Sequence, residues 1–347
     1  MDVITKNDFA AGDVVLYHGT AVISRLIRLF DGTEVNHAAV YLGDGTLGEA
    51  IGKGLSRQTV PTSLAQSEYV IVRRLKTDPG TMLPVLDKAT TYLANGNRYG
   101  YEQIVLLAFL GLTRKLAVNG TLRWLLRKLF DEASSWLMQH GDRQPMICSE
   151  FVYRCYDEAR PAAHDPYALD INPFPASIGT GAPGSRAMAP VSGKVHRDSL
   201  LAWTAGVMTD RSRSAANVLA RTFEAGAKKK RVLSAAERKM AALSLDELGD
   251  RYLEELKRKP EAKARAFEQE AAIRDTEMLA GVRKFSEAWY RATVTARPRA
   301  LESWSARAAK GETPTALDHL LRTAADFVTP GDLYTCGNLF SVGKIMK

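Results

Sequence analysis

The chain has 347 residues, a formal net charge of +8 and 46% apolar residues. This length allows one large or two medium domains with a substantial core, and 25% charged residues exclude wholesale disorder and fibrous repeats. The longest apolar run, 104–112, is far shorter than the roughly 20 residues of a transmembrane helix. Three cysteines are too few for a disulfide framework, and no CxxC or HExxH motif indicates a zinc site.

The first residues, MDVITKNDFAAGD, lack the basic and apolar segments of a signal peptide. With free thiols expected, we predict a cytoplasmic protein, and peripheral membrane association or export without a signal stays open. The net positive charge gathers in 201–320, but acidic residues interrupt almost every basic run. The exception, 228–231 (KKKR), is short, and the pattern disfavours a nucleic-acid partner.

The first 75 residues have the pattern of a β-rich region with one helix. Short apolar or β-branched runs bounded by glycine and aspartate are typical of strands. The helix is expected at 24–30, where Leu26, Ile27 and Phe30 have helical spacing. Strands are expected at 14–16, 37–42, 47–51 and 69–73.

The rest of the chain is predicted to be mainly helical, with a loop rich in proline, glycine and serine at 160–198. Within 200–327, Met278, Val282, Phe285 and Trp289 follow one another at helical spacing and predict one buried face. The last residues, from Thr329, change to turn and extended chain. Earlier helices are expected at 82–94, 101–112, 122–137 and 148–158.

Cys148 is the candidate nucleophile because it opens the helix expected at 148–158. The positive end of the helix dipole and unpaired N–H groups favour the thiolate, the dipole by about 0.3–1 kcal/mol. This stabilisation is too small to make the thiol a good nucleophile without a nearby imidazole. Taken alone, the position favours a buried structural cysteine, so the assignment depends on other residues.

His37 and Glu49 are the candidate base and its partner. His37 begins a strand in which alternation places it on the same face as the small Ala39. Glu49 lies in a mostly apolar strand, where a carboxylate needs a polar partner such as an imidazole N–H. The alternatives are a structural histidine at a strand end and an exposed carboxylate at a sheet edge.

The loop between these two strands decides whether His37 and Glu49 share a face. An even, unbulged loop pairs Val40 with Glu49 and turns the carboxylate away from His37. A three-residue loop at 43–45 pairs Ala39 with Glu49 and leaves the carboxylate one diagonal step from His37. We predict the three-residue loop, because Gly45 can supply the left-handed conformation that it requires.

Five segments together carry a resemblance: GDVVLYHGT, NHAAVYLGDGTLGEAIGKGL, NGNRYGYEQ, MICSEFVYRCYDEA and TPGDLYTCGNLFSVG. They resemble the circularly permuted papain-fold cysteine amidases of the YiiX/YebB-like branch of the NlpC superfamily, which is related to lecithin:retinol acyltransferase. In that family the strand with the histidine precedes the helix with the cysteine. The resemblance implies Cys148 as nucleophile, His37 as base and Glu49 as the third polar residue. No cofactor-binding or metal-ligating residues are predicted.

The implied fold class is α+β, a permuted papain-like (NlpC-type) fold with an antiparallel sheet and a cysteine-bearing helix, plus a large helical insertion. We expect a catalytic domain at 9–184 and a helical accessory region at 185–326. The segment 327–347 is expected to return to the catalytic domain, since it resembles the family's terminal segment.

The leading hypothesis is a cysteine hydrolase, amidase- or peptidase-like, that acts through an acyl-enzyme on Cys148. One alternative is a lipid-directed acyltransferase or thioesterase, with the apolar and basic stretch 104–130 in peripheral contact with a membrane. The leucines of this stretch fit a buried core slightly better. Another alternative is a non-enzymatic binding or scaffold protein. The expected partner is a peptide or lipid that contains an amide or ester.

Overall fold

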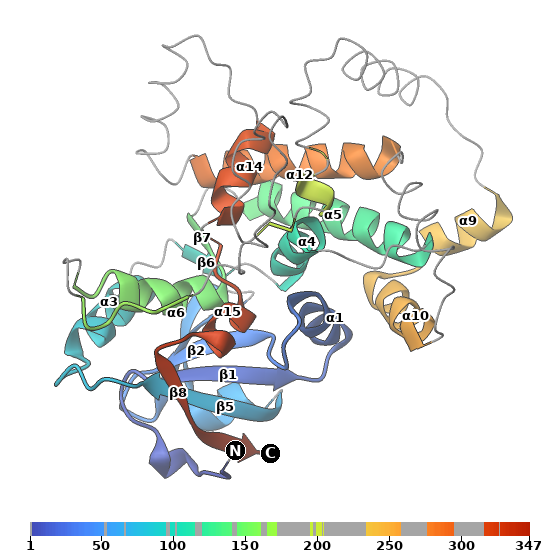
Figure 1. Cartoon of the computed structure of the whole chain (residues 1–347). Helices are drawn as coiled ribbons and strands as arrows, with labels where there is room; N and C mark the ends of the chain where they lie inside the picture. The colour runs from blue at the N-terminus through green and yellow to red at the C-terminus, as the bar shows by residue number, and fades with distance from the viewer. Residues whose placement is uncertain are drawn as a thin grey trace, which may run out of the picture. The chain divides into compact units, whose positions relative to one another are not determined.

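The computed structural model shows a chain divided between a sheet-based part and a helical part (Figure 1). Unit 1 comprises residues 1–106, 142–173 and 327–347, and unit 2 comprises 107–141 and 174–326. The predicted domain limits stay a prediction, because the boundary at 184/185 and most of the loop expected at 160–198 lie outside the described residues. The structure describes residues 2–51, 54–65, 67–94, 98–100, 103–114, 120–140, 144–160, 165–171, 195–196, 199–202, 204, 234–257, 276–294, 316–325 and 327–347.

Unit 1 is built on a six-stranded antiparallel sheet in the order β4-β3-β2-β1-β5-β8. Alternation in β1 sends Val14 and Leu16 into one core cluster and Val15 and Tyr17 into another, so both faces of the sheet are covered. The predicted α+β class with an antiparallel sheet is confirmed. The strands are β1 (Val14–Gly19), β2 (His37–Tyr41), β3 (Thr46–Ile51), β4 (Gly54–Thr59), β5 (Ser67–Leu75) and β8 (Leu339–Met346).

The helix that carries Cys148 packs against β2 and β3. This helix, α6, spans Cys148–Asp157 and buries Phe151, Val152 and Cys155 in the larger core cluster. Gly48 of β3 lies beneath it, where a Cβ would come within 3.2 Å of the Phe151 ring. The close approach of helix and strand therefore depends on a glycine at this position.

Shorter elements complete unit 1. A small parallel pair joins β6 (Arg98–Gly100) to β7 (Gln144–Met146), just before α6. The sequence did not predict β4, whose polar residues give it the pattern of an exposed edge, or the short helix that follows it. The other helical elements are η1 (Lys6–Asp8), α1 (Val22–Asp31), α2 (Val60–Leu64), α3 (Leu83–Ala94), α15 (Pro330–Thr335) and the first residues of α4 (Gln103–Thr113).

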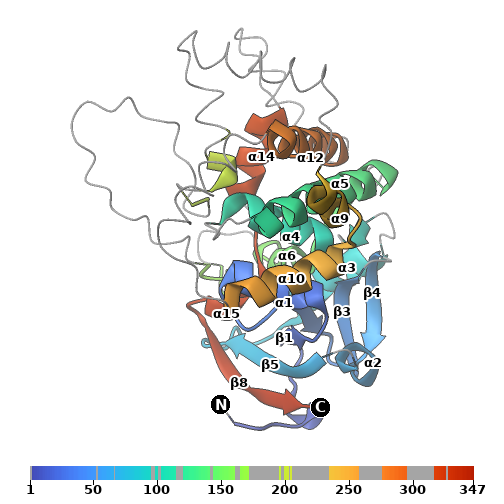
Figure 2. The same ribbon diagram turned by 90° about the vertical axis from the view of Figure 1, so that its right-hand side faces the viewer.

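The C-terminal segment is tied into unit 1 at several points. β8 pairs with β5, and the N-terminal residues run beside β8 through a bridge between Val3 and Lys344 (Figure 2). At the start of α15, Asp31 accepts hydrogen bonds from Thr329 Oγ1 at 2.9 Å and from Gly331 N at 2.7 Å. The segment therefore supplies a strand of the sheet, and the Asp31 carboxylate at the end of α1 caps the first turn of α15.

The β2–β3 turn has the odd length predicted from the sequence. Ala39 pairs with Glu49, and Leu42 N donates to Thr46 O at 2.9 Å. Gly45 adopts φ +79°, in the left-handed region. Glu49 consequently lies on the same face of the sheet as His37, and this prediction is confirmed.

Unit 2 is a group of packed helices. The buried face predicted at Met278, Val282, Phe285 and Trp289 is confirmed, with all four side chains at most 4% exposed. The Phe285 ring lies 5.7 Å from Phe109 and 6.0 Å from Phe130, between centroids. Beside the second half of α4, the helices are α5 (Gly120–His140), α9 (Ala235–Ala241), α10 (Leu245–Lys257), α12 (Thr276–Val294) and α14 (Ala316–Ala325).

The aliphatic side chains that the structure describes in 104–112 and 120–130 are buried, and Leu122, Leu125 and Leu129 have no exposed surface. Arg127 forms an ion pair with Glu277, with Nη1 and Oε2 2.7 Å apart. These three leucines belong to the core, which the sequence analysis favoured slightly over contact with a membrane. In the part of the chain that the structure describes, no helix combines the length and apolarity of a bilayer span.

We predict that Gly45→Ala weakens the β2–β3 hairpin by about 1 kcal/mol, because alanine resists the left-handed conformation. No atom lies within 4 Å of a Cβ built at Gly45, so the loss has a backbone origin. Gly45→Asn is the matched control and should lose less, since asparagine tolerates this conformation. Hydrogen exchange of the β2 and β3 amides measures both. Equal protection in the two variants would contradict this account.

Candidate active site

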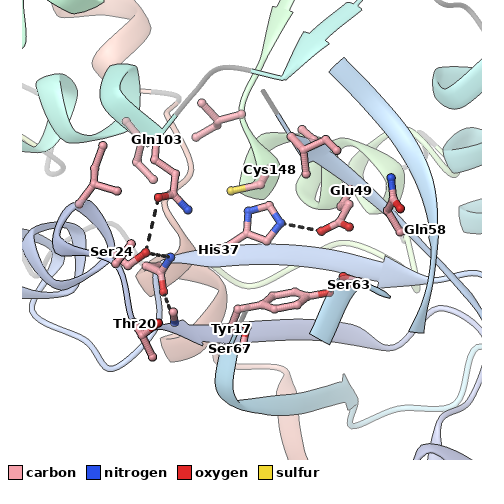
Figure 3. Close-up of a pocket in the computed structure, with 18 of the residues that line it drawn as sticks. Tyr17, Thr20, Ser24, His37, Glu49, Gln58, Ser63, Ser67, Gln103 and Cys148 are labelled. Atoms are coloured by element: carbon pink, nitrogen blue, oxygen red, sulfur yellow. Dashed lines mark hydrogen bonds and ion pairs between the residues drawn. The ribbon is translucent and has the colours of Figure 1, made fainter. Parts of the chain in front are cut away.

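A pocket of about 780 Å³ opens in unit 1 over the sheet (Figure 3). Cys148, His37 and Glu49 all line it. Cys148 comes from the start of α6, His37 from the start of β2 and Glu49 from β3. The three residues nominated by the sequence therefore reach one cavity from three different elements.

Cys148 is the first residue of α6 and is 5% exposed. Burial raises the pKa of its thiol, but the positive charge and hydrogen bond of His37 act against burial. Backbone N–H groups of Ala38 and Ser149 also stabilise the sulfur, and together these contacts hold the pKa below its ordinary value. The site thus favours the thiolate, the reactive form of cysteine.

His37 is held between two groups. Its Nε2 lies 2.8 Å from Glu49 Oε2, and the carboxylate is almost completely buried. Burial lowers the pKa of His37, but the Cys148 thiolate and the hydrogen bonds to Cys148 and Glu49 raise it to about 10. Because Nε2 forms the hydrogen bond with Glu49, Nδ1 is the ring nitrogen that can interact with the sulfur of Cys148. The arrangement is that of an imidazolium between two anions.

The Tyr17 ring packs against the His37 ring. The two ring centroids are 5.0 Å apart at an interplanar angle of 60°. The Tyr17 hydroxyl shares a 2.6 Å hydrogen bond with Ser63 Oγ. Burial and the nearby Glu49 carboxylate raise the pKa of Tyr17 well above its ordinary value, so it stays neutral. The sequence analysis missed this residue, although alternation along β1 places Tyr17 on the same buried face as Val15.

A second group of polar residues, also missed from the sequence, lines the pocket beside the catalytic candidates. Asn36 directly precedes His37 and contacts Ser24 of α1, and Ser24 contacts Gln103 at the start of α4. Gln103 closes the segment NGNRYGYEQ, which was one available signal. These residues are uncharged, in contrast to the His37–Glu49 pair.

The remaining wall of the pocket is mixed. Its large aliphatic side chains are Ile23, Ile51, Ile104, Leu106 and Ile147, and its polar side chains are Thr20, Gln58, Thr62, Ser63 and Ser67. Among the described residues, no group of three or more histidine, cysteine, aspartate or glutamate side chains is placed to hold a metal ion. The pocket presents a thiol, an imidazole, a carboxylate and neutral hydrogen-bonding groups.

Comparison with known proteins gives one curated relative. No protein-family model matches the chain. The chain is 27% identical over 165 residues to a protein named probable lipoprotein peptidase YaeF, from Escherichia coli strain K12. The match covers 45% of this chain and 58% of YaeF, so the chain spans less than two thirds of its relative.

Among solved structures, the chain matches the crystal structure of the metalloprotein YiiX from Escherichia coli O157:H7. The sequences are 16% identical, and the match covers 43% of this chain and 65% of the other. The TM-score of 0.28 is too low to establish a shared fold.

We predict that the rate at which iodoacetamide alkylates Cys148 falls less from pH 9 to pH 7 than that of an ordinary thiol, because its lowered pKa favours the thiolate. Cys336 is an internal control, since burial raises its pKa above the ordinary value. Its alkylation should fall roughly tenfold for each pH unit below that pKa. Peptide mass mapping of the intact chain after timed labelling measures both rates.

The variant His37→Ala should give Cys148 a steeper pH dependence, closer to that of Cys336, because burial then raises the thiol pKa without the opposing charge of His37. A parallel loss of reactivity at Cys148 and Cys336 in the unaltered chain would contradict an activated thiol.

Proposed function

We propose that the chain is a cysteine hydrolase of the amidase or peptidase type, from the permuted papain-like YiiX/YebB branch of the NlpC superfamily. Cys148 is the nucleophile, His37 the general base and acid, and Glu49 the residue that orients His37. The observation that carries this proposal is the buried 2.8 Å contact between His37 and Glu49 beside a cysteine at a helix start. The similarity to a protein named as a peptidase supports it.

The reaction follows from the charge states of the pair. The Cys148 thiolate attacks the carbonyl carbon of the substrate and forms a carbon–sulfur bond, while the carbonyl π electrons move to oxygen. The tetrahedral intermediate collapses, and His37 gives its proton to the leaving amine or alcohol. His37 then takes a proton from water, whose oxygen attacks the thioester and releases Cys148. Glu49 holds the ring in one orientation and stabilises its positive charge.

The substrate in this proposal is a peptide or another amide-containing molecule. A lipid-directed acyltransferase would use the same residues, with an alcohol or amine in place of water. That alternative depends on membrane contact through 104–130, and the burial of the leucines that the structure describes in this stretch counts against it. The peptide reading is therefore preferred.

Cys148→Ala and His37→Ala should each abolish acyl-enzyme formation with little effect on folding. The first removes the nucleophile, and the second removes the group that stabilises it and protonates the leaving group. Intact-mass analysis after incubation with separate peptide and lipid pools detects the trapped acyl group and identifies its class. An acyl adduct that persists in Cys148→Ala would contradict the assignment of Cys148 as the nucleophile.

Glu49→Gln should slow acylation at least about tenfold, because an amide neither stabilises the imidazolium nor fixes its ring as the carboxylate does. The side chain keeps its size, so the buried site loses charge without gaining a cavity. Stopped-flow release of p-nitrophenolate from p-nitrophenyl butyrate measures the acylation rate. Activity close to that of the unaltered chain would exclude Glu49 as the third residue.

A further inference from the structure

The pocket has two walls, and the sulfur of Cys148 lies between them. Figure 3 shows Ser24 and Gln103 on one side of Cys148, and Glu49 on the other side, beyond His37. The first wall is built by α1 and the start of α4, and the second by β3, β4 and α2. We call the first the α1–α4 wall, and the residues of these two helices that line it are Ile23, Ser24, Gln103, Ile104 and Leu106.

The chemistry of the proposed reaction decides which wall receives the acyl group. His37 gives its proton to the leaving group, so the leaving atom must lie beside the imidazole. The imidazole is on the Glu49 side of the sulfur, because its Nε2 lies 2.8 Å from Glu49 Oε2. The acyl chain and the leaving group extend from the carbonyl carbon in different directions. The acyl chain of a substrate joined to Cys148 therefore points away from Glu49 and toward the α1–α4 wall.

The α1–α4 wall presents hydrocarbon and neutral polar groups. Ile23, Ile104 and Leu106 supply its aliphatic surface. Its two polar side chains contact each other, since Ser24 Oγ donates to Gln103 Oε1 at 3.5 Å. An aliphatic acyl chain gains about fourfold in affinity for each CH₂ group that it buries on such a surface. An acidic chain would instead lose water without a counterion from these five residues, and it would approach the nucleophilic thiolate.

We propose that the α1–α4 wall binds the acyl group of the substrate and selects a neutral, aliphatic one, with Ile23 and Ile104 as specificity-determining residues. This inference rests on the proposed function and narrows its substrate class. For a peptide, the residue that supplies the scissile carbonyl then has an aliphatic side chain such as that of leucine. A fatty acyl group shares this chemistry, so the two sources need separate substrates.

Esters with one leaving group and different acyl groups measure this selectivity. The acylation rate with each p-nitrophenyl ester is divided by the rate of that ester with 2-mercaptoethanol, which removes differences in intrinsic reactivity. We expect the butyrate to exceed the acetate at least about fourfold after this correction, because it buries two more CH₂ groups. The hemisuccinate is similar in length but acidic, and it should fall at least about tenfold below the butyrate. Of the N-acetylleucine and octanoate esters, the one with the higher corrected rate identifies an amino-acyl or a fatty-acyl source.

Substitutions on the two walls locate the acyl group. Ile23→Ala and Ile104→Ala should each lower the corrected butyrate-to-acetate ratio by about threefold, because they remove hydrocarbon from the α1–α4 wall. Ile51 of β3 lines the opposite wall, so Ile51→Ala is the matched control and should keep the ratio within about 1.5-fold. Alkylation of Cys148 by iodoacetamide reports whether the thiol site is intact in each variant. Because Ile23 is only partly buried, its variant keeps the test available if Ile104→Ala disturbs the fold.

Two results would overturn the inference while the proposed function stands. If the corrected rates of the acetate, butyrate and hemisuccinate are equal, the α1–α4 wall does not select the acyl group. If Ile51→Ala lowers the butyrate-to-acetate ratio as much as Ile23→Ala does, the acyl group does not lie on this wall. If no ester and neither the peptide nor the lipid pool acylates the unaltered chain, the proposed function itself fails, and this inference fails with it.

Discussion

The buried contact between His37 and Glu49 is the interaction on which the candidate site depends. A carboxylate that is almost completely buried is costly unless it is paired, and here it is paired with an imidazole that the Cys148 thiolate also keeps charged. The pairing exists only because the turn between β2 and β3 has an odd number of residues. One residue more or fewer would turn the carboxylate to the opposite face of the sheet.

Helix α6 brings the third member to this pair, and the rest of unit 1 holds the helix. Phe151 packs over Gly48 of β3, and Ser149 Oγ donates to Val328 O at 2.7 Å. The first contact sets the distance from helix to sheet, and the second joins the helix to the C-terminal segment. Cys148 is thus positioned by packing on one side of its helix and by a buried hydrogen bond on the other.

The sequence predicted the features that have local signals. The glycines at 43 and 45 indicated the turn, strand alternation indicated the face of His37, and helical spacing indicated the buried face around Phe285. It did not predict β4, because a polar edge strand has little apolar alternation. Nor did it predict the contacts of Ser24 with Asn36 and Gln103 in the pocket wall. These residues are far apart in the sequence, and only the folded chain brings them together.

The place of the last strand has a consequence for the order of events during synthesis. β5 is made early, but its neighbour β8 follows only after the whole of 107–326 has been added. Until then the β5 edge has no permanent partner, and α6 lacks the buried hydrogen bond from Ser149 to Val328. Closing a sheet across so long a stretch of chain is slow, because the ends must meet before their contacts stabilise them. The nascent protein therefore carries a complete set of candidate catalytic residues well before the framework that holds Cys148 is finished.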